Sequence, residues 1–190
     1  WGVSAAPRYG GVTFAQFDAD GARTLPIATV GGTNISPAGG PWLVYSGTGW
    51  LNAWIGNTSY GGGRINETRG LVGGYFYTLV DNLDTAGTVY LDGASLVMAN
   101  GTLAVGYVKS APSGFNYAFH LQRFTIPPGT TDVLPALGST VDILSTGNIQ
   151  SFQDIALVAT GSSLLGIWAD DRWGATRELY AEPIDLHSCP

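Results

Sequence analysis

The sequence predicts an all-β protein built from repeated hairpins. Three segments follow one pattern, in which a Leu-Val pair precedes a small polar turn, then a large apolar residue and, four residues later, an aromatic side chain: 43–54, 96–107 and 157–168. Charged residues make up only 12% of the 190 residues and 28 are glycine, which suits many tight turns and suits amphipathic helices poorly. No stretch shows sustained apolar spacing at the helical period.

The spacing of the repeats predicts an architecture. The three copies begin at residues 43, 96 and 157, a separation close to the length of one four-stranded propeller blade. We therefore expect one β-propeller-like body over residues 1–190, with about three to four blades of four-stranded antiparallel sheets. The alternative is a β-sandwich or jelly roll, in which the repetition is fortuitous.

In chain order, turn signals and alternating apolar residues divide this body into units. Residues 12–18 alternate as a strand and are similar to 178–185, so we expect them to form the last strand of a preceding blade. Each of the three following units contains one hairpin: 25–70, 71–128 and 139–187. The run Pro127-Pro128-Gly129 ends the middle unit, because each proline removes a donor from the strand ladder.

Within each hairpin the residues alternate in a way that favours packing on both faces of a sheet. In the middle hairpin Leu103, Val105 and Tyr107 share one face, while Ala104 and Gly106 on the second face are small enough for a neighbouring sheet to approach closely. The closing aromatic residues of the three hairpins are then equivalent plugs between adjacent sheets: Trp54, Tyr107 and Trp168.

Charge and hydropathy exclude several classes of partner. The net charge is −6 and no two basic residues are adjacent, whereas phosphate binding needs clustered cations. We therefore expect no nucleic-acid partner and no anionic membrane surface. The longest uncharged stretches are too short and too rich in Gly and Tyr to span a bilayer, which predicts a soluble protein without membrane insertion.

Other features indicate an extracellular protein. The chain starts at Trp1, as expected for a processed product or a trimmed sequence whose secretory signal is gone. Four Asn-x-Ser/Thr triplets are candidate glycosylation sites, with compositional coincidence as the alternative: Asn34, Asn57, Asn66 and Asn100. Asn100, expected at a hairpin tip, is the best placed. The single cysteine, Cys189, is a candidate for an interchain disulfide or else an inert tail thiol.

A resemblance now adds to this pattern. Residues 154–172 with 178–182 look like a blade of secreted β-propeller repeat proteins, and residues 14–21 look like the strand and turn that end such a blade. The resemblance implies a fold rather than an activity. Three hairpins and a leading strand are about three and a half blades, whereas propellers close with about four to eight. Either the termini join to complete a four-bladed ring, or the remainder of the body sits on another chain or was cleaved away, since unclosed edges aggregate.

Most catalytic and metal-binding signatures are absent from the sequence. It contains two histidines and one cysteine, with no zinc-binding spacing, no nucleophile elbow and no phosphate-binding glycine loop. We expect His120, in an aromatic strand, to be a packed core residue rather than a ligand. We expect no cofactor. Asp18-x-Asp20-Gly21 begins like a calcium loop but lacks the other acidic ligands, so we favour a plain Asx turn there, with calcium binding as the alternative.

Glycoside hydrolysis needs two carboxylates flanking the bond, and four aspartates are candidates: Asp92, Asp154, Asp170 and Asp171. For Asp170 and Asp171 we favour an exposed turn with a local pair to Arg172. An enzyme is therefore the less favoured hypothesis, and whether the chain is one remains open.

Aromatic residues expected in loops supply the remaining functional signal, because exposed rings stack on sugars and form protein interfaces. Trp173, Arg172 and Tyr60 are the predicted ligand-binding residues. The sequence thus favours a secreted, non-catalytic binding or assembly module for a glycan or protein ligand, completed by another chain or by copies of itself. The alternatives are a structural shell or virion component and a subunit of a glycoside-cleaving enzyme.

Overall fold

A computed structural model describes residues 2–5, 12–24, 28–30, 37–47, 50–57, 63–69, 77–81, 90–110, 117–126, 134–146, 152–161, 163–171 and 176–186. These residues form strands arranged in four antiparallel sheets, each of which follows chain order. The first sheet contains β1 (Gly2–Ala5), β2 (Val12–Gln16) and β3 (Ala28–Val30). The second contains β4 (Pro37–Tyr45), β5 (Trp50–Asn57), β6 (Gly63–Arg69) and β7 (Tyr77–Asp81).

The other two sheets follow in the same manner. The third contains β8 (Tyr90–Ala99), β9 (Thr102–Ser110), β10 (Tyr117–Thr125) and β11 (Ala136–Thr146). The fourth contains β12 (Phe152–Thr160), β13 (Ser163–Asp170) and β14 (Glu178–Asp185). No helix occurs among the described residues, and none of them forms a helical segment long and apolar enough to cross a membrane.

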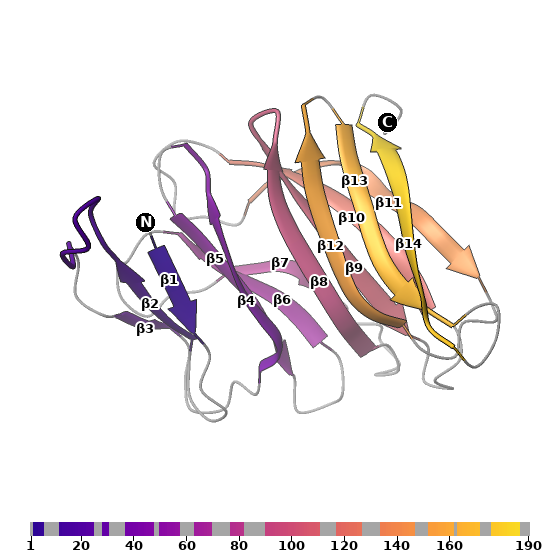
Figure 1. The fold of residues 1–190 in the computed structure, drawn as a ribbon, viewed down its shortest axis with the longest axis horizontal. Coiled ribbons are helices and arrows are strands. Elements are labelled where there is room, and N and C mark those ends of the chain that lie inside the picture. The colour runs from indigo at the N-terminus through magenta and orange to yellow at the C-terminus, as the bar shows by residue number, and fades with distance from the viewer. Residues whose placement is uncertain are drawn as a thin grey trace.

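The sheets follow one another as the blades of a propeller do. The first strand of each sheet contacts the first strand of the next, so that β1, β4, β8 and β12 form the inner row. Figure 1 shows the four sheets in an arc, with β1 at one end and β14 near the other. The all-β, propeller-like prediction is confirmed, and four separate sheets replace the two facing layers that a sandwich requires.

The three predicted hairpins have the same register. Leu43 pairs with Asn52, Leu96 with Val105 and Leu157 with Gly166, so the closing aromatic residue follows the partner of the leucine by two positions in each hairpin. At the tip of the middle hairpin Asn100 and Gly101 have φ of 49° and 73°, the left-handed values that a two-residue hairpin turn requires. The repeat is therefore structural.

The strands at the sheet boundaries differ from the predicted arrangement. Val12–Gln16 pairs with β1 on one side and β3 on the other, so it is the middle strand of the first sheet and not the last strand of a blade. The strand Ala136–Thr146 pairs with β10 and completes the third sheet, although Pro127-Pro128-Gly129 was expected to end a unit. The two prolines and the glycine indicate a turn, and turns join strands within one sheet as well as strands of different sheets.

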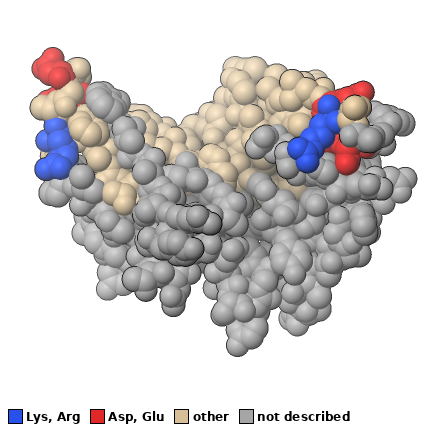
Figure 2. Space-filling model, turned by 60° about the horizontal axis from the view of Figure 1, so that its bottom comes forward, with Lys and Arg blue, Asp and Glu red and all other residues tan. Residues whose placement is uncertain are grey.

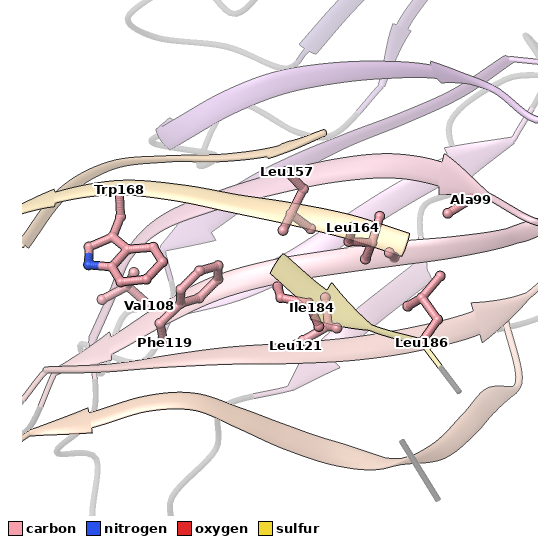
Figure 3. Close-up of a cluster of buried hydrophobic side chains, with 10 residues drawn as sticks. Ala99, Val108, Phe119, Leu121, Leu157, Leu164, Trp168, Ile184 and Leu186 are labelled. Atoms are coloured by element: carbon pink, nitrogen blue, oxygen red, sulfur yellow. The ribbon is translucent and has the colours of Figure 1, made fainter. Parts of the chain in front are cut away.

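The third sheet has a hydrophobic core on each face. Toward the second sheet, Leu103, Val105 and Tyr107 of β9 pack with Leu51 and Ala53 of β5. Toward the fourth sheet, the opposite face of β9 and β10 packs against β12, β13 and β14, as Figure 3 shows for Trp168, Phe119, Leu157 and Ile184. The predicted sharing of faces in this hairpin is confirmed, because side chains alternate along a strand.

Glycine sets the distance between the third and fourth sheets. A Cβ on Gly106 would stand 2.9 Å from Cε2 of Phe119 and 3.0 Å from Cδ1 of Leu157, and a Cβ on Gly166 would stand 3.2 Å from Cε1 of Phe119. The Phe119 ring, fully buried, thus fills the space that the two missing side chains leave. The close approach predicted from Ala104 and Gly106 is confirmed, because a Cβ at position 106 would crowd Leu157 of the fourth sheet.

Candidate functional site

Asp92 in β8 and Asp154 in β12 each lie at a register shift near the start of their strand, and the two strands are neighbours in the inner row. The pairing of β8 with β9 shifts between Leu91 and Gly93, which leaves Asp92 out of register. The pairing of β12 with β13 shifts between Gln153 and Ile155, which leaves Asp154 out of register. A β-bulge of this kind bends the strand and redirects a side chain, and bulges are frequent beside active sites.

A hydrogen bond fixes the two strands relative to one another. The backbone N of Leu157 in β12 donates to Oγ of Ser95 in β8 over 2.9 Å, and both groups are buried. Asp92 lies three positions before Ser95, and Asp154 lies three positions before Leu157. β8 and β12 are neighbours and run in the same direction (Figure 1), and each aspartate is the third residue of its strand, so both lie near the same end of the inner row.

A third aspartate belongs to the same end of the fourth sheet. Asp170, the last residue of β13, pairs with Phe152 at the start of β12 and is completely buried. Its Oδ2 accepts a hydrogen bond from Nε1 of Trp168 over 2.8 Å. The expectation of an exposed turn at Asp170 is therefore wrong, because this residue continues the alternation of β13 and points toward the third sheet.

A second polar cluster lies on the face of the third sheet that looks toward the second sheet. Nδ1 of His120 in β10 is 2.6 Å from Oδ1 of Asp142 in β11, and the His120 ring stacks on Tyr107 of β9 with centroids 5.4 Å apart. Tyr107 also forms a hydrogen bond with Thr140. Nζ of Lys109 lies 5.5 Å from the centre of the Tyr107 ring, within the range of a cation–π contact.

Burial dominates the electrostatics of this cluster. It lowers the pKa of His120, an effect that the hydrogen bond and charge of Asp142 oppose but do not cancel. Burial also lowers the pKa of Lys109 and raises the pKa of Tyr107, in each case by disfavouring the charged form. His120 was predicted to be a packed core residue; it stacks on Tyr107 but is only partly buried, because its ring nitrogen reaches the exposed Asp142 at the edge of the sheet. Among the described residues no group of three or more His, Cys, Asp or Glu could hold a metal ion.

The Asp18-x-Asp20-Gly21 segment, which begins like a calcium loop, has the geometry of the favoured Asx turn. Oδ1 of Asp18 accepts hydrogen bonds from the backbone N of Asp20 over 3.0 Å and of Ala22 over 2.8 Å. Gly21 has φ of 83°, which a left-handed turn position requires. This is an Asx turn in which backbone donors occupy the carboxylate oxygen. Calcium binding stays the less favoured interpretation of this turn.

Some of the other predicted site residues are described by the structure and some are not. Trp173, Arg172, Tyr60, Asn34 and Cys189 lie outside the described residues. The remaining three acceptor asparagines are at different places in the strands: Asn57 ends β5, Asn66 pairs with Trp54 and Thr78 within β6, and Asn100 is exposed at the tip between β8 and β9. Glycosylation and ligand binding at these residues stay predictions.

Charge is sparse on the face that Figure 2 presents. The charged side chains described there gather at its two ends, and the described residues between them are uncharged. The lower edge of Figure 1, where β8 and β12 begin, comes forward in this view.

Comparisons with known proteins give a likeness of fold. No family model and no curated protein matches the sequence. Among solved structures, the chain is similar to a thermostable family-43 glycoside hydrolase, with a TM-score of 0.54 and 14% sequence identity over 95% of this chain and 70% of that chain. That enzyme is a five-bladed β-propeller. The likeness concerns the fold.

Proposed function

We propose that this protein binds neutral glycans at the end of the arc where β8 and β12 begin. The observation that carries the proposal is the pair of matching bulges, which lie at the same end of neighbouring strands and contain Asp92 and Asp154. Carboxylates accept hydrogen bonds from sugar hydroxyl groups, and such charge-assisted bonds are stronger than bonds between neutral groups. The likeness in fold to a glycoside hydrolase supports a carbohydrate ligand.

The charge of the chain narrows the class of glycan. With a net charge of −6, the protein repels uronic acids and sulfated sugars at long range. Two of the carboxylates in that total, Asp92 and Asp154, lie at the proposed site and place part of this repulsion there. Neutral oligosaccharides are therefore the expected ligands, and Trp173, Arg172 and Tyr60 remain proposed contacts that would add stacking surface.

Substitution of each aspartate by asparagine tests the binding site. We expect Asp92→Asn and Asp154→Asn to weaken binding of a neutral oligosaccharide by about 10- to 100-fold, since a bond to a charged acceptor is worth roughly 1.5–3 kcal/mol. A glycan array selects the oligosaccharide, and titration calorimetry measures the affinity. Asp20→Asn, the same change in an exposed turn of the first sheet, is the matched control and should leave the affinity unchanged.

Glycoside cleavage is the second candidate, and the same two residues favour it. In such enzymes one carboxylic acid protonates the glycosidic oxygen while a second carboxylate activates water or attacks the sugar. Release of reducing ends from the bound oligosaccharide would establish this activity. Binding that requires both aspartates without any product release would establish a binding module, and retention of full affinity by both variants would contradict the proposed site.

A further inference from the structure

The outer face of the fourth sheet is the face turned away from the third sheet. Along β13 the residues Leu164, Gly166, Trp168 and Asp170 are buried toward the third sheet, so the residues between them point outward. The registers with β12 and β14 align these outward residues in adjacent rows. The apolar residues of this face are Ala156, Val158, Leu165, Ile167, Ala169, Leu179, Ala181 and Pro183, and the polar residues Thr160, Ser163 and Asp185 lie on the same side at the end near the β12–β13 turn.

Several of the eight apolar side chains are exposed. Leu179 is 77% exposed and Val158 is 42% exposed, and both are among the large hydrophobic residues on the described surface. Leu165, Ile167 and Ala169 in the central strand are only half-buried. A contiguous apolar surface is uncommon on a monomer and marks a site of interaction.

The acidic residues of β14 lie on the opposite side of the sheet. Glu178 pairs with Asp170 and Glu182 pairs with Gly166, so both belong to the face that looks toward the third sheet. Asp185, at the end of β14, is the charged residue that the registers place on the outer side. Two copies of a chain with net charge −6 can therefore meet on this face without bringing rows of carboxylates together.

The outer face also continues a series of interfaces already present in the chain. On β9 the residues Ala104, Gly106 and Val108 face the fourth sheet. Under the hairpin repeat, the corresponding residues of β13 are Leu165, Ile167 and Ala169. In each preceding sheet, the face that corresponds to the outer face packs against the next sheet of the chain. A sheet of this same chain is therefore the kind of surface that packs on the outer face.

We propose that the outer face of the fourth sheet is a dimer interface, in which it packs against the same face of a second copy. A two-fold arrangement closes on itself, whereas packing against the first sheet of the next molecule would propagate into a filament. Face-to-face packing would also cover Val158 and Leu179 in both copies. This interface is independent of the proposed glycan site.

A charge placed in the outer face tests the dimer. The native chain should be a dimer by light scattering and sedimentation, and Leu179→Glu should raise the dimer dissociation constant by about tenfold or more, because it buries an unpaired carboxylate. The matched control is Tyr45→Glu, which introduces the same charge at another exposed hydrophobic residue, 53% exposed, in the second sheet. That variant should dimerise as the native chain does.

A control for folding and a second substitution in the same face complete the test. Far-UV circular dichroism and thermal unfolding establish that Leu179→Glu is folded, and Val158→Glu in β12 should have the same effect on dimerisation. A native chain that is monomeric at all concentrations would overturn the proposal, and would leave a sheet of another polypeptide as the occupant of this face. A dimer that survives both substitutions would overturn it as well.

Discussion

The two faces of the third sheet pack in different ways. On the face toward the fourth sheet, Phe119 meets Trp168 edge-on with ring centroids 5.6 Å apart, within a cluster whose described members are all apolar or aromatic. On the face toward the second sheet, Tyr107 stacks on His120, which pairs with Asp142. The same two strands, β9 and β10, supply both faces, because their side chains alternate.

Because of this difference, the stability contributed by one face should depend on packing volume and that contributed by the other on pH. The apolar face depends on close packing, so changes of volume there should have the largest effects on stability. The other face contains a buried core at Leu103 and Val105 and, beside it, titratable groups. Its contribution to the free energy of unfolding should therefore change with pH.

The largest effect is expected from Phe119→Ala. The ring is fully buried between Gly106 and Gly166, so its removal should lower the free energy of unfolding by about 3–5 kcal/mol. Urea denaturation followed by fluorescence measures the change. On the other face, Tyr107→Phe removes only the hydroxyl group that bonds Thr140 and should cost about 1 kcal/mol. Equal losses for the two variants would contradict the distinction between the faces.

A smaller loss is expected from Gly106→Val, which adds volume to the apolar face. The new Cβ would lie 2.9 Å from Phe119 and 3.0 Å from Leu157, so overpacking should cost about 1–3 kcal/mol. Ser139→Val, at an exposed position of β11, is the control and should change stability by less than about 0.5 kcal/mol. Unfolding curves that superimpose for native protein and Gly106→Val would mean that the sheets are not in close contact there.

The smallest effect is expected from the titration of His120. Because burial lowers its pKa below the ordinary value of 6.5, the unfolded chain takes up a proton more readily than the folded chain. The contribution of neutral His120 to stability is therefore complete above that value and is lost as the pH falls through the folded-state pKa.

Proton NMR of the histidine ring measures this pKa directly. His120→Gln assigns the signal, since His187 is the other histidine in the sequence. In Asp142→Asn the pKa of His120 should fall further, because the carboxylate that favours the charged ring is gone. A pKa above 6.5 in the native protein would show that the ion pair outweighs burial.

Much of the fold was predictable from local pattern. The turn Asn100-Gly101 and the alternation around Leu103 predict a hairpin, and its packing on both faces followed from the small residues Ala104 and Gly106. The extent of each sheet was less predictable. The strand Ala136–Thr146 follows a run of prolines and glycine, and only its pairing with β10 assigns it to the third sheet.

The candidate site was only partly visible in the sequence. Asp92 and Asp154 could be found as carboxylates a few residues before the Leu-Val pairs of two repeats, but their adjacency depends on the contact between Ser95 and Leu157. The pairing of His120 with Asp142 had no sequence signal, because it depends on an irregular register between β10 and β11.

The sequence by itself determined the hairpins, their turns and the two-residue alternation that gives each strand two faces, because these depend on backbone conformation and on neighbouring residues. Only the tertiary structure decided which sheet lies against which face, why Asp170 is buried and which aspartates stand together. Those outcomes depend on contacts between residues far apart in the chain, where packing volume and burial rather than local preference select the partner.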